Sequence, residues 1–166
     1  MPTFWLDSNV FMQAKNLYYA FDIAPGFWDV ILESAVDGLI GCPMMVYDEI
    51  AKGGDDLATW ASGAKAVCGG FFIEPDKNTQ GSFSTIAEYV VKGGNYHPAQ
   101  SALFLKGADP WVIACASGSK GVVVTQEKLV GTDSKKVKIP NICKHYGIEY
   151  VSCYEMLRRI GRPLKV

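Results

Sequence analysis

The sequence predicts an α/β protein in which helices cover both faces of a central, mainly parallel sheet. Short apolar segments alternate with longer segments of helical periodicity along the chain. The segment 122–125 (VVVT) is β-branched and continuously apolar, which is typical of a strand covered on both faces. The chain has 166 residues, a length that corresponds to one domain, so we expect a single domain over residues 1–166.

The expected strands are short apolar runs bounded by turn-forming or polar residues. The first ends in an acid at Asp7, and the second begins after Gly38, which can close the preceding helix. The fourth is the VVVT segment, followed by a polar loop over residues 127–138. We expect strands at residues 3–7, 39–42, 71–73, 122–125 and 148–151.

The expected helices are recognised by apolar spacing and by their start signals. Trp28, Ile31 and Ala35 lie on one face of a helix. Pro110 stands at a first-turn position, and Ser152 begins a capping box. We expect helices at residues 11–15, 28–36, 44–52, 56–67, 83–91, 98–106, 110–117, 140–146 and 152–160.

The distribution of charge is more informative than its sum. A net charge of −1 argues against non-specific nucleic-acid binding by bulk charge. However, residues 1–119 hold 6 lysines and 13 acids, whereas residues 120–166 hold 10 basic and 4 acidic residues. This asymmetry indicates a basic surface that could meet phosphates beside an acidic region that could hold cations.

The composition and the apolar runs also exclude some classes of protein. With 49% hydrophobic and 20% charged residues, the chain is neither disordered nor of low complexity. No apolar run approaches the ~20 residues that a membrane span needs. Asp7 interrupts the apolar residues near the N-terminus that a secretory signal would require. We therefore expect a cytoplasmic protein with no membrane partner.

Four acids stand where a parallel sheet places its binding sites, beyond the carboxyl ends of the strands. Asp7 ends the first expected strand, and Glu127 follows the VVVT strand. Asp109 precedes a helix, and Glu49 lies near the edge of the buried face of its helix. Taken singly, the two aspartates could be helix caps and the two glutamates solvated surface groups.

Taken together, the four acids suggest a cation site. Carboxylates that converge repel one another, which raises their pKa values unless a cation lies among them. Oxygen-only sites suit Mg²⁺ or Mn²⁺, which can activate water and stabilise charge on a transferring phosphoryl group. The hydroxyls of Ser8 and Thr125 and the amide of Asn9 could orient the carboxylates or bound waters.

Four segments resemble the signature segments of PIN domains, namely LDSNVFMQAK, VYDEI, ADPWVIACA and VVVTQE. They occur in the family's order and cover nearly the whole chain. The chain is similar in particular to small single-domain PIN proteins of the VapC toxin type and to an uncharacterised bacterial PIN-like group. The resemblance implies a three-layer α/β/α PIN-like fold. It also implies an endoribonuclease that hydrolyses RNA phosphodiester bonds with one or two Mg²⁺ or Mn²⁺ ions.

The resemblance assigns a role to each acid. Asp7 would be a direct metal ligand, Asp109 a second ligand, and Glu49 the helix glutamate that completes the cluster. Glu127 stands where the family usually has aspartate. We therefore expect Asp7, Glu49, Asp109 and Glu127 to be the catalytic and metal-binding residues, supported by Ser8, Asn9 and Thr125.

Two of these assignments have rivals in the sequence. Asp48 competes with Glu49, and only one of two adjacent helical residues can face the site. The acid-then-aromatic pair that often follows the fourth acid in VapC-like proteins is replaced by LVGTDSKK. Asp133, within that segment, could therefore substitute for Glu127 as the fourth acid.

The expected partners follow from the basic loop and from the resemblance. The lysines that follow the VVVT strand could receive the RNA backbone, or they could belong to a solvated loop. The resemblance implies the toxin of a type II toxin–antitoxin pair, a homodimer, and a cognate antitoxin that inserts into the active-site groove. The alternative is a catalytically weak PIN-like module that binds RNA or protein. The lysines expected to bind RNA are Lys128, Lys135, Lys136 and Lys138.

Aromatic residues and histidines give less specific signals. A group of aromatic residues early in the chain could stack on RNA bases or fill the core. His97 and His145 show no partner pattern, and we assign them no role. The aromatic residues in question are Tyr18, Tyr19, Phe21, Phe27 and Trp28.

Overall fold

A computed structural model describes residues 1–165, which contain a five-stranded sheet whose neighbouring strands are all parallel. The strand order is β3-β2-β1-β4-β5, so β1 and β4 are central neighbours. This confirms the α/β class and the parallel sheet. The strands are β1 (Phe4–Leu6), β2 (Ile40–Pro43), β3 (Phe72–Ile73), β4 (Val122–Val124) and β5 (Tyr150–Val151).

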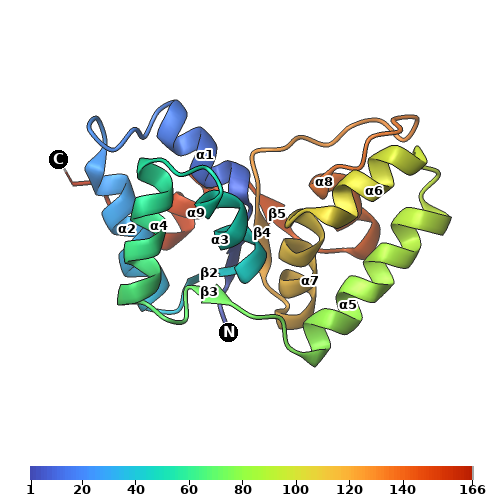
Figure 1. The fold of residues 1–166 in the computed structure, drawn as a ribbon, viewed down its shortest axis with the longest axis horizontal. Helices are drawn as coiled ribbons and strands as arrows, with labels where there is room; N and C mark the ends of the chain where they lie inside the picture. The colour runs from blue at the N-terminus through green and yellow to red at the C-terminus, as the bar shows by residue number, and fades with distance from the viewer. Residues whose placement is uncertain (166) are drawn as a thin grey trace.

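Helices flank the sheet and produce three layers (Figure 1). Helices α1, α2, α4 and α9 lie on one side of the sheet, and α5 to α8 lie on the other. Within residues 1–165, no helix has the length and apolar character needed to cross a membrane. The helices are α1 (Ser8–Asn16), α2 (Pro25–Val36), α3 (Met44–Ala51), α4 (Asp56–Val67), α5 (Lys77–Glu88), α6 (Pro98–Lys106), α7 (Asp109–Ser119), α8 (Ile139–Tyr146) and α9 (Cys153–Ile160), with a π-helical segment η1 (Tyr89–Gly93) after α5.

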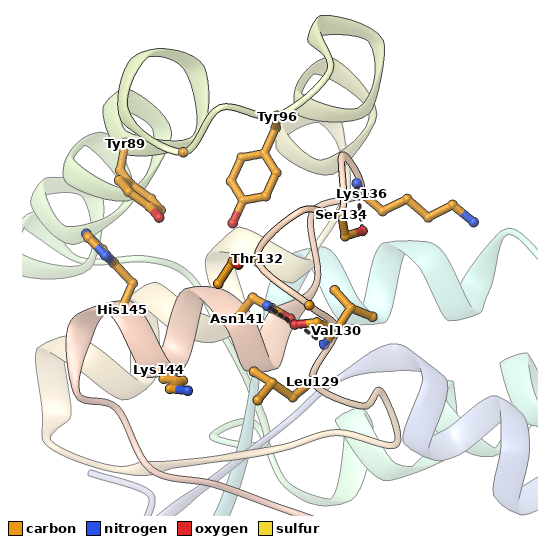
Figure 2. Close-up of a pocket in the computed structure, with 12 residues that line it drawn as sticks. Tyr89, Tyr96, Leu129, Val130, Thr132, Ser134, Lys136, Asn141, Lys144 and His145 are labelled. Atoms are coloured by element: carbon orange, nitrogen blue, oxygen red, sulfur yellow. Dashed lines mark hydrogen bonds between the residues drawn. The ribbon is translucent and has the colours of Figure 1, made fainter.

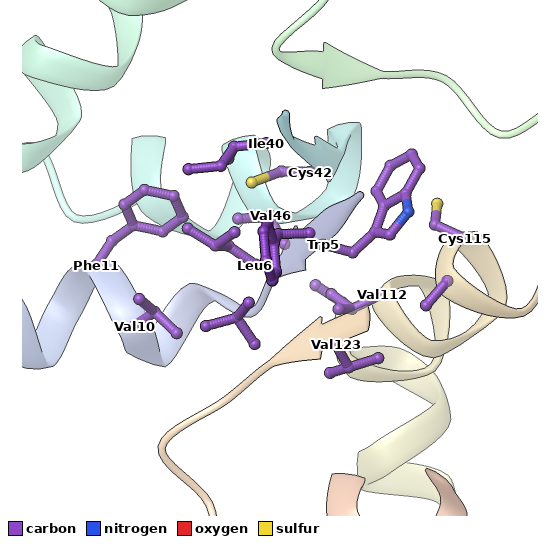
Figure 3. Packing of buried hydrophobic residues seen from close by; sticks show 14 of the residues in the cluster. Trp5, Leu6, Val10, Phe11, Ile40, Cys42, Val46, Val112, Cys115 and Val123 are labelled. Atoms are coloured by element: carbon purple, nitrogen blue, oxygen red, sulfur yellow. The ribbon is translucent and has the colours of Figure 1, made fainter. Parts of the chain in front are cut away.

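Strand β1 is buried on both faces and carries the core. Trp5 lies toward α7, where its Nε1 donates a hydrogen bond to Ser119 Oγ at 2.8 Å. Figure 3 shows Leu6 among side chains that include Val46, on the opposite side of the strand from Trp5. Consecutive strand residues point to opposite faces, so this one short strand anchors both helical layers.

Three helices begin three or more residues earlier than the sequence indicated, among them α2, which begins at Pro25 rather than at residue 28. Helix α1 begins at Ser8 because Asp7 caps it, accepting a hydrogen bond from the Asn9 backbone N–H. Helix α5 begins at Lys77 because Asp76 caps it in the same way. The residues at the start of α5 are polar and lack apolar periodicity, which explains why the spacing rule placed its start at residue 83.

Most of the early aromatic residues fill the core, so base stacking is wrong for Phe27 and Trp28. Both are almost fully buried. Tyr19 stacks on Phe27 at 4.4 Å between ring centroids, and Phe21 stacks on Trp28 at 4.2 Å. Of this group only Tyr18 is largely exposed, at 73%.

Candidate metal centre

The four expected acids stand around the carboxyl ends of the two central strands. The chain crosses from β1 to β2 on one side and later returns to β4 on the other side of β1. In such a sheet a crevice opens between the strands where the direction of winding reverses. Asp7 follows β1, Glu127 follows β4, Asp109 begins α7, and Glu49 lies in the last turn of α3.

Asp7 is fully buried, with 0% of its surface exposed, and hydrogen bonds hold both its backbone and its carboxylate. Its backbone N–H donates to the Val124 carbonyl oxygen at 3.1 Å, which extends the β1–β4 ladder. Its Oδ1 accepts from the Asn9 N–H at 3.4 Å, and its Oδ2 accepts from Thr125 Oγ1 at 3.1 Å. The supporting role expected for Thr125 is thus a direct contact, whereas Asn9 contributes its backbone N–H.

Asp109 and Asp7 form a carboxyl pair within hydrogen-bonding reach of each other. Asp109 does not cap α7, because the cap position belongs to Ala108 and Asp109 is the first helical residue. The helix-cap explanation therefore fails for Asp109. Its carboxyl instead lies among the other acids, where no capping bond accounts for its presence.

Burial and mutual repulsion raise the pKa values of this pair. Burial is the main cause that raises the pKa of Asp109 to about 8, and the charges of Asp7, Glu127 and Glu49 add to it. Burial also raises the pKa of Asp7 to about 6, with a contribution from the charge of Glu127. The hydrogen bonds that Asp7 accepts oppose this shift. Without a cation, the pair therefore retains a proton at neutral pH.

Glu49, and not Asp48, faces the cluster. Glu49 Oε2 accepts a hydrogen bond from Ser8 Oγ at 2.7 Å, and Oε1 accepts from the Ala108 backbone N–H at 2.8 Å. A Cβ atom at Gly107 would lie 3.2 Å from Glu49 Oε1, so a larger residue there would press against the glutamate carboxylate. Asp48 is exposed on the outer side of the helix.

Glu127, and not Asp133, lies beside the aspartate pair. Glu127 Oε2 accepts from the Ile139 N–H at 2.9 Å, and its own N–H donates to Thr125 Oγ1 at 3.1 Å. Its charge contributes to the raised pKa values of both aspartates. Asp133 is exposed on the loop between β4 and α8.

The four expected RNA-binding lysines differ in their surroundings. Lys138 Nζ lies 4.0 Å from Glu127 Oε1, which makes it an ion-pair partner of the cluster. Lys135 Nζ donates to the Asn95 carbonyl oxygen at 3.3 Å. Lys128 and Lys136 are exposed. The loop therefore carries lysine ammonium groups both next to the acidic cluster and farther away from it.

The sequence interpretation missed the two backbone donors that hold the glutamates. The N–H groups of Ala108 and Ile139 stand at the starts of α7 and α8, where helix N–H groups have no partner within the helix. The partial positive charge of a helix start favours a nearby carboxylate. A signal was present, because Pro110 and Pro140 each mark the first turn of their helix.

The donor chemistry of the cluster suits a hard divalent cation. Within residues 1–165, no three His, Cys, Asp or Glu side chains form a ready-made ligand group. Hydrogen bonds hold Glu49 and Glu127 in place. Mg²⁺ commonly uses only one or two carboxylates and completes its coordination with water and substrate phosphates. The Asp7–Asp109 pair fits that requirement.

Comparison with protein families matches residues 4–163 to a family model described as Domain of unknown function (DUF4411). The match includes all four acids and the loop that carries the lysines. No curated protein matches the chain.

Proposed function

The chain belongs to the DUF4411 family, and from its acidic centre we propose that it is a Mg²⁺- or Mn²⁺-dependent endoribonuclease of the PIN type. The observation that carries the proposal is the pairing of the fully buried Asp7 with the half-buried Asp109 at the crevice between β1 and β4. Buried carboxylates are costly unless they are protonated or neutralised by a cation. A divalent cation would replace the shared proton and leave both groups ionised.

Each residue of the cluster has a distinct task in this proposal. When bound, a divalent cation would supply Lewis-acid activation of water and neutralise charge on the phosphodiester. Asp7 and Asp109 would hold the cation, while Thr125 fixes the orientation of Asp7. Glu49 and Glu127, each anchored by a backbone N–H, would orient water molecules beside the scissile phosphate. By analogy with PIN nucleases, cleavage would leave 5′-phosphate and 3′-hydroxyl ends.

The lysine-bearing loop favours RNA over a small phosphate ester as the substrate. Lys138 adjoins Glu127, and the exposed Lys128 and Lys136 extend the positive charge away from the acids. A strand of RNA presents one phosphate per nucleotide, so it can contact such a series of lysines. A small substrate would contact only the lysine nearest to the acids.

A direct test is cleavage of a mixed RNA pool with Mg²⁺ or Mn²⁺. Wild type, Asp7→Asn and Asp109→Asn would be purified identically, and Asp133→Asn would serve as the matched control in the exposed loop. We expect chelator-sensitive cutting by wild type and by Asp133→Asn, with a loss of at least about 10³-fold in the two cluster variants. Equal cutting by all four proteins would contradict the proposed site.

The toxin assignment rests on the PIN resemblance. We propose that the protein acts in the cytoplasm as a homodimeric toxin and that a cognate antitoxin silences it. Induced expression should then arrest growth in wild type but not in Asp7→Asn. Arrest by both proteins at equal abundance would argue against a toxin that acts through this site.

A second candidate function is a PIN-like module that binds RNA or protein with little catalysis. It is favoured by the pairing of Lys138 with Glu127 and by the absence of a three-residue ligand group within residues 1–165. Mn²⁺ titration separates the two candidates. Saturable Mn²⁺ binding that is lost in Asp109→Asn supports the nuclease, whereas RNA binding without Mn²⁺ binding supports the module.

A further inference from the structure

A cavity of about 360 Å³ is lined in part by the loop that follows Glu127 (Figure 2). It is enclosed by the loop after β4, by α8, and by the segment that joins α5 to α6. Its size is that of a pocket for one small organic group. Its lining includes Tyr89, Tyr96, Thr132, Lys136 and His145, and we refer to this space as the aromatic cavity.

The aromatic cavity adjoins the acids through shared backbone. Glu127 of the acidic cluster and Leu129 of the cavity wall are two residues apart, which limits their Cα separation to about 7.6 Å. Ile139, which donates to Glu127, is likewise two residues from Asn141 in the cavity wall. A polymer whose phosphate lies at the acids therefore has a neighbouring unit within reach of the cavity.

Irregular backbone shapes the cavity before any ligand arrives. Tyr89 begins the π-helical segment η1, a form that is rare and is frequent at functional sites. Asn95, just before Tyr96, adopts a left-handed conformation with φ of 54°. The Lys135 ammonium and the Asn95 carbonyl oxygen bond at 3.3 Å, and this contact ties the loop after β4 to the wall that carries both tyrosines.

The loop side of the cavity is also held in place. Asn141 Nδ2 donates to the Val130 carbonyl oxygen at 2.8 Å, and Asn141 Oδ1 accepts from the Val130 N–H at 3.1 Å (Figure 2). This two-point contact joins α8 to the loop after β4. Both walls are thus fixed, which lowers the conformational cost of ligand binding.

The cavity presents neutral hydrogen-bonding groups on aromatic surfaces. Figure 2 shows the hydroxyl groups of Tyr89, Tyr96 and Thr132 directed toward the space between them. Burial raises the pKa of Tyr96 to about 12, with a further contribution from Tyr89, so its hydroxyl stays protonated. His145 stacks on Tyr89 with 3.7 Å between ring centroids. Hydroxyls beside stacked rings match the edge and the face of a nucleobase.

The positive charge lies at the rim rather than inside. The Lys136 ammonium extends away from the centre of the cavity in Figure 2, and Lys144 on α8 is exposed. A phosphate would meet these lysines outside the cavity. The interior of the cavity therefore offers a place for a base, and the lysines at its rim offer a place for the phosphate backbone that carries the base.

We propose that the aromatic cavity binds one unpaired base of the substrate RNA, in the nucleotide next to the scissile phosphate. This proposal rests on the proposed nuclease function. A base in a duplex is stacked and paired, so it cannot enter the cavity without leaving the helix. The substrate class that follows is single-stranded RNA, cut beside a base that the cavity selects.

The first test measures binding without metal, so that it does not depend on catalysis. The four nucleoside 5′-monophosphates and inorganic phosphate are titrated into protein in chelator, and the resonances of Tyr89, Tyr96 and His145 are followed by NMR. We expect at least one monophosphate to shift these resonances, with inorganic phosphate binding at least about tenfold more weakly. No saturable shift with any monophosphate, or equal binding of phosphate alone, would overturn the proposal.

Variants locate the binding in the cavity. His145→Ala removes a stacking surface and Tyr96→Phe removes one hydroxyl with little change of shape. Each should weaken the preferred monophosphate about tenfold or less. Lys92→Gln is the matched control, because Lys92 is exposed at 74%, lies on the same π-helical segment and pairs with Glu88 outside the cavity. Unchanged affinity in both cavity variants would place the nucleotide elsewhere and contradict the proposal.

Cleavage then separates a substrate site from a structural role. On RNA hairpins, wild type should cut the unpaired loop and spare the stem. Tyr96→Phe should raise KM several-fold and broaden the base preference, with less than about twofold change in kcat. A fall in kcat alone, with base preference intact, would contradict base selection. Monophosphate binding without metal-dependent cleavage would instead overturn the nuclease, and cleavage without monophosphate binding would overturn only the cavity proposal.

Discussion

The acidic cluster and the aromatic cavity share one loop, yet their backbones and side chains differ in kind. The cluster places its acids just after two strands, at the start of α7 and in the last turn of α3, and backbone N–H groups at helix starts hold the two glutamates. The cavity places neutral hydroxyls and rings on a π-helical segment, a left-handed residue and a long loop. Mostly regular elements thus hold the acids, and irregular segments form the proposed surface for base recognition.

The two regions also differ in their effect on the stability of the folded state. Ionising carboxyl groups whose pKa values are raised in the folded state costs free energy. The cluster therefore destabilises the metal-free protein at high pH. The cavity carries no buried charge among the side chains described and should have little effect on stability. Neutral substitutions of the cluster acids should therefore stabilise the metal-free protein at high pH and lower its activity. Substitutions in the cavity should leave the stability nearly unchanged.

The largest expected effect is a loss of stability with rising pH in the metal-free protein. The pKa values of Asp7 and Asp109 lie above the ordinary value of 3.8, so the folded state retains protons that the unfolded chain has released. Stability must then fall between about pH 4 and pH 8. The shift of Asp7 alone corresponds to about 3 kcal/mol, which would lower Tm by roughly 6–12 °C at this chain length, and the shift of Asp109 adds to this loss. Thermal melts in chelator across this range measure it.

Asp109→Asn is the decisive comparison for that prediction. It removes one ionisable group from the pair, so it should flatten the pH profile and raise Tm at pH 8 above that of wild type. Saturating Mn²⁺ should stabilise wild type at pH 8 and have little effect on the variant. Parallel pH profiles for the two proteins would show that the pair does not control stability. Tyr96→Phe should leave the slope unchanged.

The next effect concerns two adjacent acids on one helix. Glu49→Gln removes the charge that Ser8 and the Ala108 N–H hold beside the aspartates, so RNA cleavage should fall about 10–100-fold. Asp48→Asn changes the exposed neighbour and should leave cleavage within about twofold of wild type. Initial rates at saturating Mn²⁺ test this pair, and equal losses in both variants would contradict the assignment of Glu49.

A smaller effect is expected at Thr125, whose hydroxyl links the two central strands. Thr125→Val removes the donor to Asp7 Oδ2 and the acceptor of the Glu127 N–H. Losing one such buried hydrogen bond costs about 1–3 kcal/mol, so Tm should fall by a few degrees. Cleavage should fall about tenfold because Asp7 loses its orientation. Thr125→Ser retains the hydroxyl and should recover most of the activity; a serine variant as poor as valine would argue for packing alone.

The sequence was sufficient to find the cluster because each acid adjoins a strong local signal. Asp7 follows a buried strand, Asp109 precedes the proline of a helix start, and Glu127 follows the VVVT strand. The rule that parallel strands end at one edge then brings these residues together. The choices of Glu49 over Asp48 and of Glu127 over Asp133 required contacts that the structure supplies, with Ser8 and with the Ile139 N–H.

The aromatic cavity could not be found in this way. His145 and Tyr89 are 56 residues apart and lie on different elements, so no spacing rule relates them. The π-helical turn at Tyr89 shifts side chains away from the positions that a helix of 3.6 residues per turn would give. The run Gly93-Gly94-Asn95 signalled an irregular backbone, but not what that backbone would place side by side.

Lys138 lies on the loop that the two regions share and gives the smallest and most specific effect. Its ammonium lies 4.0 Å from Glu127 Oε1, so it competes with a cation for the charge of the cluster. Lys138→Gln should therefore tighten Mn²⁺ binding a few-fold and, because it removes a phosphate contact, weaken RNA binding by a similar factor. Calorimetric titration of Mn²⁺ and filter binding of RNA measure the two changes, with Lys128→Gln as the control that should change RNA affinity alone. If Lys138→Gln weakened both ligands, Lys138 would have to support the cluster structurally, and the ion pair would not be a competitor of the metal.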